Sequence, residues 1–158
     1  MNLIWKVEGL EELETRLSEV MSFDRADTVA RQTLVKAAKG AMESVYADVH
    51  ANVPYGDKPR DQNNPIHMKD TVRVDARIPN DSDRKSTMVS QTDVAIATVT
   101  VKKSAVSLAQ EFGTTKVAGK HFLRTALERN TDTVVSKFKD DLSSYIQSVA
   151  AKQSRGSK

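Results

Sequence analysis

The chain contains no cysteine, and this absence removes a whole branch of protein chemistry. Disulfide bonds, thiolate nucleophiles and cysteine-ligated metal centres are all excluded. Aromatic residues are scarce, at 5%, and apolar residues make up 39% of the 158 residues, which is typical of an α+β protein with a modest core. A chain of this length is expected to form one domain, residues 1–151, followed by a polar tail, residues 152–158.

Long hydrophobic runs are also missing, so no window of the sequence reaches the length that spans a bilayer. The opening residues MNLIWKVEGL mix Lys6 and Glu8 into a short apolar run and show no cleavage site for secretion. We therefore expect a protein that is made and kept in a cytoplasm, or in something assembled there, without a membrane partner. The net charge of +3 does not indicate a nucleic-acid binder, because such proteins concentrate Lys and Arg on one face.

Three stretches have the 3.6-residue period of amphipathic helices. The first, residues 10–20, is short. The second, from about Asp24 to His50, is rich in alanine, which lets a helix pack closely against its neighbours. The third runs from about Thr125 to Ala150, and Thr125 with Glu128 fits a capping box at its start.

Other stretches alternate with a period of two, which is typical of half-buried strands. The candidates are residues 72–78, 86–91, 93–102 and 105–112, with residues 3–8 as a further short edge strand. Short links between them favour antiparallel pairing. The predicted fold class is therefore α+β: an antiparallel sheet of about four strands, packed by a long helix from the N-terminal half and a C-terminal helix.

The stretch from Ala105 to Asn130 organises the rest of the chain. It is predicted to begin as a strand, to turn at Gly113, and to re-enter apolar sequence at Phe122 after a small basic loop, Thr114 to Lys120. A P-loop would lie in such a place, but five residues instead of four separate Gly113 from Gly119, and His121 replaces the hydroxyl residue that binds magnesium. No nucleotide or other cofactor is expected.

No catalytic constellation is visible. His50, His67 and His121 are scattered and lack the spacing of a zinc site, and no serine has a recognisable nucleophile setting. The chain is therefore not expected to be an enzyme. A basic path could be drawn through Lys58, Arg60, Arg73, Arg77, Arg84, Lys85, Lys102 and Lys103. Aspartates interrupt this path and no aromatic residue is interleaved to stack bases.

Residues 109–116 (AQEFGTTK) and 121–128 (HFLRTALE) resemble the signature of a tail-component family of long-tailed, lambdoid-type bacteriophages. Its members are head-tail connector, tail-completion or tail-terminator-like proteins. The family signature reads approximately as an acid, Phe-Gly-Thr, a small basic loop, then Pro-Phe-Leu-Arg-Pro-Ala-Leu. Residues 7–13 (VEGLEEL), Val53-Pro54 and residues 68–72 (MKDTV) are similar to further family pieces in the same order. His121 and Thr125 stand where the family often has proline, and the capping box at Thr125 is expected to replace the second one.

The resemblance implies a structural virion protein of the tail and neck, without enzyme activity, assembled in the cytoplasm of a bacterial host. It implies a homo-oligomeric ring, a hexamer, at the top of the tail, where the ring meets the head-completion or connector protein and the tail tube protein. Genome DNA would pass through the lumen without being read. The alternative that the residues leave open is a small cytoplasmic nucleic-acid-binding module.

A ring is a closed set of heterologous contacts, so each subunit needs two different surfaces. We expect one surface to combine the loop 52–67 with the turn 79–85, and the other to be the loop Thr114 to Lys120. The candidate interface residues are Tyr55, Lys58, Arg60, Arg84, Lys85, Thr114, Thr115, Lys116 and Lys120. The residues expected to anchor the second surface are Glu111, Phe112, Gly113, Phe122, Leu123 and Thr125.

Overall fold

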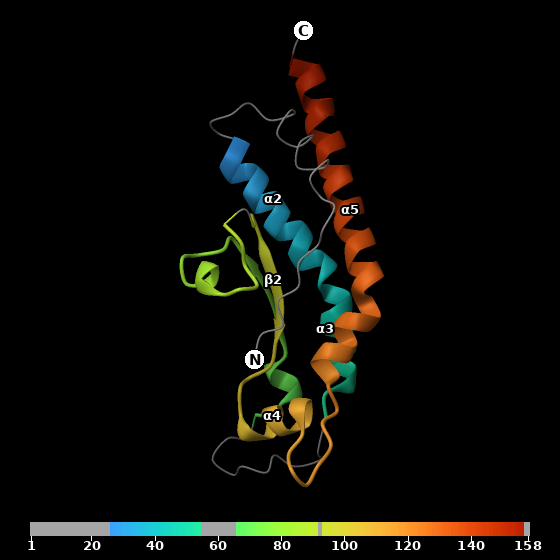
Figure 1. The fold of residues 1–158 in the computed structure, drawn as a ribbon. Coiled ribbons are helices and arrows are strands. Elements are labelled where there is room, and N and C mark those ends of the chain that lie inside the picture. Colours follow the sequence, from blue (N-terminus) through green and yellow to red (C-terminus); the bar gives the residue numbers. More distant parts are fainter. Residues whose placement is uncertain (1–25, 55–65, 92, 157–158) are drawn as a thin grey trace.

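A computed structural model describes residues 26–54, 66–91 and 93–156. In chain order its elements are α2 (Ala26–Ala41), α3 (Glu43–Asn52), η1 (Lys69–Thr71), β1 (Arg73–Arg77), η2 (Asp83–Lys85), β2 (Ile96–Thr100), α4 (Ala105–Phe112) and α5 (Phe122–Gly156). The two strands form one layer, α2 packs on both of them, and α5 packs along α2 and α3 (Figure 1). The coarse prediction of an antiparallel sheet packed by two long helices is confirmed. The expected strand 3–8 and helix 10–20 lie outside the described residues.

The helix predicted from Asp24 to His50 is present as two helices that meet at Met42. The Met42 N–H is shared between the carbonyls of Ala38 and Lys39, each at 3.2 Å, and the regular pattern resumes with Tyr46 bonded to Met42. The small residues of α2 match its place in the fold. Ala37 and Ala41 are buried in the core cluster, and short side chains let the helix approach the sheet and α5 together.

The sheet of the described residues has two antiparallel strands, with Val74 opposite Val99 and Ala76 opposite Ala97. Val74, Ala97 and Val99 pack into the core, whereas alternate residues of β1 are exposed, as the period of two requires. Two predicted strands are wrong. Residues 86–91 form turns, and residues 105–112 form the helix α4.

The turns at 86–91 have a clear physical cause in Arg84. Its guanidinium donates to the carbonyls of Ser90 at 2.7 Å, Gln91 at 2.8 Å and Asp93 at 3.3 Å. The Asp93 carboxylate in turn accepts from the Ser90 N–H at 2.7 Å and the Ser90 hydroxyl at 3.0 Å. These bonds satisfy backbone groups that a strand would offer to a neighbouring strand, so the segment folds on itself.

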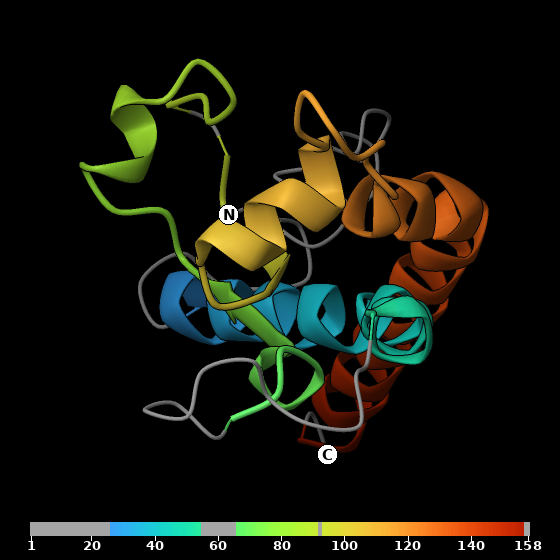
Figure 2. The same cartoon turned by 90° about the horizontal axis from the view of Figure 1, so that it is seen from below.

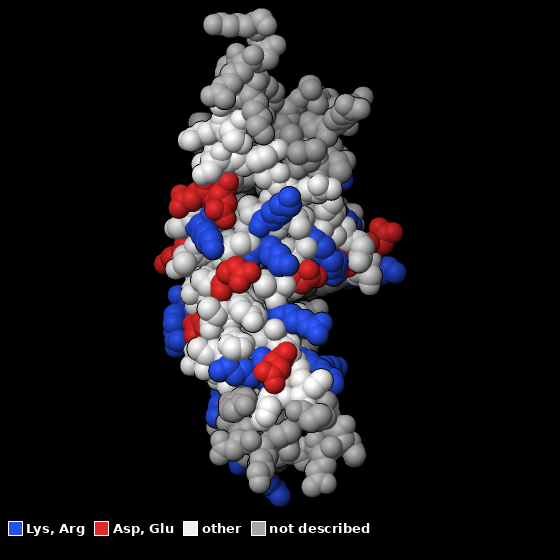
Figure 3. All heavy atoms as spheres, turned by 180° about the vertical axis from the view of Figure 1, so that it is seen from behind, with Lys and Arg blue, Asp and Glu red and all other residues white. Residues whose placement is uncertain are grey.

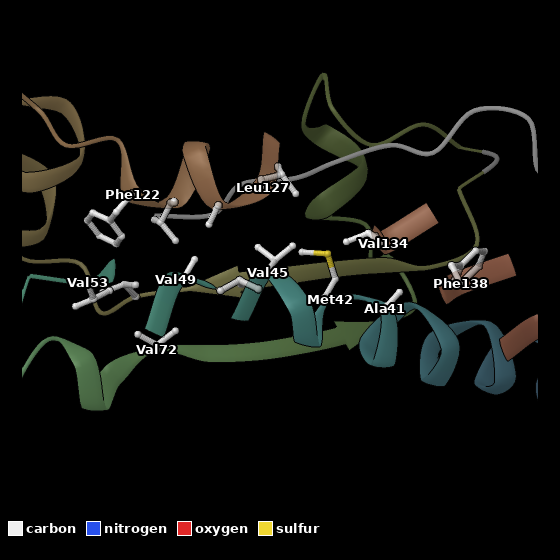
Figure 4. Packing of buried hydrophobic residues seen from close by; sticks show 14 of the residues in the cluster. Ala41, Met42, Val45, Val49, Val53, Val72, Phe122, Leu127, Val134 and Phe138 are labelled. Atoms are coloured by element: carbon white, nitrogen blue, oxygen red, sulfur yellow. The ribbon is translucent and has the colours of Figure 1, made fainter. Parts of the chain in front are cut away.

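The core lies where α2, α3, α5 and the sheet meet, and Figure 4 shows its apolar side chains pointing toward one another. The α5 members of this core are Phe122, Leu123, Ala126, Leu127, Val134, Phe138 and Leu142. A polar residue, Asn130, interrupts the apolar face of α5. Its amide donates to the Asp48 carboxylate of α3 at 2.9 Å and to the carbonyl of Ala126 at 2.9 Å. This link fixes α3 against α5 beside the apolar contacts.

Candidate interaction surface

The helix α4 owes its start to two serines. The Ser104 hydroxyl accepts from the Ser107 N–H at 3.0 Å, and the Ser107 hydroxyl accepts from the Ser104 N–H at 2.8 Å. The Ser107 hydroxyl also donates to the carbonyl of Lys102 at 3.0 Å. This reciprocal capping satisfies backbone donors of the first turn, which explains why a helix replaces the predicted strand.

The polarity of α4 is the reverse of that in most surface helices. Its buried residues are the polar Ser107 and Glu111, four residues apart on one face. Its exposed side includes Val106, 47% exposed, and Phe112, 60% exposed. The prediction that Phe112 is a structural anchor is wrong, because the ring lies on the outer face of α4, whereas Phe122 and Leu123 of α5 are buried in the core.

Glu111 is buried because its side chain caps the longest helix of the described residues. One carboxylate oxygen accepts from the Leu123 N–H at 2.9 Å and the other from the Arg124 N–H at 3.2 Å. These donors belong to the first turn of α5, which has no intrahelical partner for them, and a negative charge there suits the helix dipole. The helix therefore begins at Phe122. The predicted capping box at Thr125 is wrong, because the Thr125 N–H already bonds to the carbonyl of His121 at 2.8 Å inside the first turn.

The connection between α4 and α5 folds back along the end of α4. The Lys120 N–H donates to the carbonyl of Gln110 at 2.6 Å, and the His121 N–H donates to the carbonyl of Glu111 at 3.2 Å. Carbonyls at the end of α4 are thereby satisfied by the chain just before α5, while Glu111 satisfies donors of α5. We call residues 104–124, which these reciprocal bonds hold together, the α4–α5 corner.

Two glycines make this close return possible. Gly113 has φ +82°, and a Cβ there would lie 2.6 Å from the backbone nitrogen of Gly119. A Cβ on Gly119 would lie 2.7 Å from the Gly113 nitrogen and 2.7 Å from the Glu111 carbonyl oxygen. His121 has φ +48°, a conformation that proline cannot adopt. The phage signature often has proline at the position of His121. A residue other than proline is required here, because the backbone before α5 is left-handed.

The loop Thr114 to Lys120 is held by its own bonds. The Thr114 hydroxyl accepts from the N–H groups of Lys116 at 3.2 Å and Val117 at 3.1 Å, and the Thr114 N–H donates to the Val117 carbonyl at 2.7 Å. Thr114 therefore has a structural role in the loop, although its side chain is exposed. Thr115, Lys116 and Lys120 are exposed and available for contact.

The other predicted surface is only partly described. Tyr55, Lys58 and Arg60 lie outside the described residues. Lys85 is exposed, whereas Arg84 is turned inward to bind the carbonyls of its own loop. The loop that carries Arg84 and Lys85 projects beside the sheet, while α4 lies at one end of the molecule (Figures 1 and 2). The structure therefore keeps these two groups of candidate residues apart.

A charged bond stabilises the turn after β1. The Arg77 guanidinium donates to the Asp83 carboxylate, which also accepts from the Asn80 N–H at 2.8 Å. The bond from Arg77, followed by the bond from Asn80, lowers the pKa of Asp83 to about 2. The same bond to Asp83 raises the pKa of Arg77.

The face in Figure 3 carries blue and red side chains interspersed, so the basic residues seen there do not form a continuous strip.

Within the described ranges, no group of three or more His, Asp or Glu residues could hold a metal ion. No helix in those ranges is long and apolar enough to cross a membrane.

The sequence interpretation missed the capping role of Glu111. The available signal was an acid just before a Phe-Gly turn, with a helix starting soon afterwards without a Ser, Thr, Asp or Asn at the usual position.

Comparison with protein-family models, with curated proteins and with solved structures finds no match for this chain.

Proposed function

We propose that this chain is a structural virion protein that forms a ring at the top of a long bacteriophage tail, completes the tail and joins it to the head-neck complex. The proposal rests on the resemblance of residues 109–128 to the tail-component signature. The observation that supports it most is the pair of hydrogen bonds that the Glu111 carboxylate accepts from the N–H groups of Leu123 and Arg124, because they unite the two halves of that signature in one structural unit.

Each element of the signature has a physical role in the α4–α5 corner. Glu111 caps α5, Gly113 allows the close return of the loop, and Phe122 and Leu123 fix the start of α5 in the core. Together they fix both ends of the loop Thr114 to Lys120, which is also bonded internally through Thr114. A preorganised loop loses less conformational entropy when it binds, which suits a contact surface in an assembly.

A ring also needs a second, different surface, and each side of a standard interface covers about 800 Å². The loop with Lys85 lies away from the α4–α5 corner, so the two could contact different neighbours (Figure 1). In this proposal the ring, a hexamer, binds the connector protein on one face and the tail tube protein on the other. Genome DNA passes through its lumen.

The direct test is electron microscopy of phage particles made without this protein. Free heads beside unjoined tails, or tails of abnormal length, are the expected result. Normal, joined virions would refute the role. Complementation by the wild-type chain supplied in trans is the control that assigns the defect to this protein.

The alternative function, a small cytoplasmic nucleic-acid-binding module, makes a different prediction. It requires DNA binding that weakens steeply with salt, because released counterions drive such binding. The mixed charge of the face in Figure 3 does not favour it. Light scattering and DNA titration at several salt concentrations separate the two: a monomeric mass together with a steep salt slope would support the module and contradict the ring.

A further inference from the structure

The outer face of the α4–α5 corner combines apolar and basic residues. Val106, Phe112 and Val117 are 47%, 60% and 55% exposed. Leu108 and Ala109 of the same helix are half-buried. Val106 and Phe112 are six residues apart, so they flank the exposed side of α4 about 120° from each other. Exposed large apolar side chains on one short helix and the loop after it favour a contact surface that is covered in an assembly.

The exposed charges of residues 101–124 have one sign. The corner and the residues just before it hold the exposed bases Lys102, Lys103, Lys116, Lys120 and Arg124. The only acid among residues 101–124 is Glu111, which is buried with both carboxylate oxygens bonded to α5. The nearby η1 adds one charge of each sign, Lys69 and Asp70, and it touches the corner through the bond from the Lys102 N–H to Thr71 at 3.2 Å. The occupant of this face should therefore be acidic with an apolar stripe.

The chain itself contains such a segment at its start. Leu10, Leu13, Leu17 and Val20 recur at helical spacing. The first 25 residues contain six acids, Glu8, Glu11, Glu12, Glu14, Glu19 and Asp24, against three bases. We infer that residues 8–20 of one copy of the chain dock on the outer face of the α4–α5 corner of a neighbouring copy. Apolar residues would meet Val106, Phe112 and Val117, and the acids would meet the surrounding lysines.

Geometry favours a neighbouring copy over the same chain. Residues 8–20 connect to α2, whose start lies at the opposite end of the molecule from α4 (Figure 1). The 26 helical residues of α2 and α3 separate the two ends by about 40 Å at 1.5 Å per residue. The five residues 21–25 span at most about 18 Å when fully extended. Even with the length of about 20 Å that a helix of residues 8–20 would add, this tether only just matches the separation, which favours the corner of a neighbouring copy.

Two identical corners are poor partners for each other, because each brings five exposed bases to the contact. The acidic segment removes this repulsion and makes the contact heterologous, which is the kind of contact that closes a ring. The inference concerns contacts between copies only. Its failure would leave the virion role intact, since particles lacking the protein test that role independently.

The absence of cysteine allows a clean cross-linking test on the full chain. Separate F112C, L10C, L13C and L17C variants are prepared, and F112C is mixed with each of the others under mild oxidation. Docking should raise the yield of the mixed disulfide dimer about tenfold or more over a T87C control pair, because it raises the local thiol concentration. Thr87 is exposed, and it belongs to the segment between β1 and β2, which projects beside the sheet and away from α4 (Figure 1). A melting curve establishes that each variant is folded, and V106C replaces F112C if needed.

The charge contribution is tested by K116E/K120E in the F112C chain. This change should reduce the cross-linked fraction, and E11K/E12K in the L13C chain should restore it. Mixed dimers that do not exceed the T87C control for any of the three leucine positions would overturn the inference. A disulfide formed within a single L13C/F112C chain at low protein concentration would overturn the assignment to a neighbouring copy.

Discussion

The Glu111 carboxylate at the end of α4 accepts a hydrogen bond from the Leu123 N–H at the start of α5, at a distance of 2.9 Å. A residue in the last turn of an eight-residue helix thus caps a helix of 35 residues. Because the bond spans twelve positions of sequence, it also closes the loop between the helices. This one buried carboxylate therefore contributes to the stability of α5, to the shape of the loop and to the orientation of α4.

Replacing Glu111 should test this dependence directly. E111A removes both acceptors and leaves two N–H groups at the buried start of α5, so we expect a loss of about 2 to 4 kcal/mol in the free energy of unfolding. E111Q keeps one oxygen but brings an amide donor toward a backbone donor, and should cost about 1 to 2 kcal/mol. Urea denaturation measures both. E128Q, at an exposed position of the same helix, is the control, and equal midpoints for E111A and wild type would contradict the cap.

Gly119 and Gly40 should respond in opposite directions to the same substitution. G119A places a Cβ 2.7 Å from three backbone atoms, which cannot move aside easily, and should cost about 1 to 3 kcal/mol. G40A places a Cβ 3.4 Å from one oxygen of Asp141, an ordinary contact, and removes a glycine from a helix. It should stabilise the protein by about 0.5 to 1 kcal/mol. Thermal unfolding compares the two, and a stable G119A variant would show that the loop does not return against α4.

The sequence predicted the helices of the core better than the elements around them. Val45 and Val49 of α3, and Val134, Phe138 and Leu142 of α5, repeat at helical spacing over long stretches. A long stretch of period 3.6 cannot be satisfied by a strand, so the pattern is decisive. The strand β1 was equally readable, because one of its faces is exposed and the other packs on the core.

The α4–α5 corner was predicted wrongly for two reasons. Eight residues are too few to distinguish the helical period of 3.6 from the strand period of two, and the hydrogen bonds that fix the corner join residues that are far apart in the sequence. Alternating Val106 and Leu108 suggested a strand, while the capping pair Ser104 and Ser107 favoured a helix. The bond of Glu111 to α5 cannot be read from either segment alone. The turns at 86–91 have the same origin, since Arg84 binds carbonyls six to nine residues away.

Phe122 and Phe112 provide a matched pair for the placement of the core. Phe122 is buried in the core cluster, so F122A should cost about 3 to 5 kcal/mol through lost burial and the cavity left behind. Phe112 is 60% exposed, so F112A should change the unfolding free energy by less than about 1 kcal/mol. Chemical denaturation of the isolated chain measures both. Similar losses for the two variants would contradict the outward orientation of α4.

The bond between Arg77 and Asp83 predicts a pH dependence with a defined sign. The pKa of Asp83 is lowered from 3.8 to about 2 in the folded chain, so the unfolded chain takes up the proton first as the pH falls. The stabilisation from Asp83 is therefore fully present above the unfolded value, declines below it, and is lost as the pH falls through the folded value. The difference in unfolding free energy between wild type and D83N should be constant at neutral pH and shrink toward pH 2, with D81N, an exposed aspartate two positions away, as the control. Because the Asp83 pair is at the surface, the effect should be small and should weaken in high salt. A difference that stays unchanged down to pH 2 would show that Arg77 and Asp83 are not paired in the folded protein.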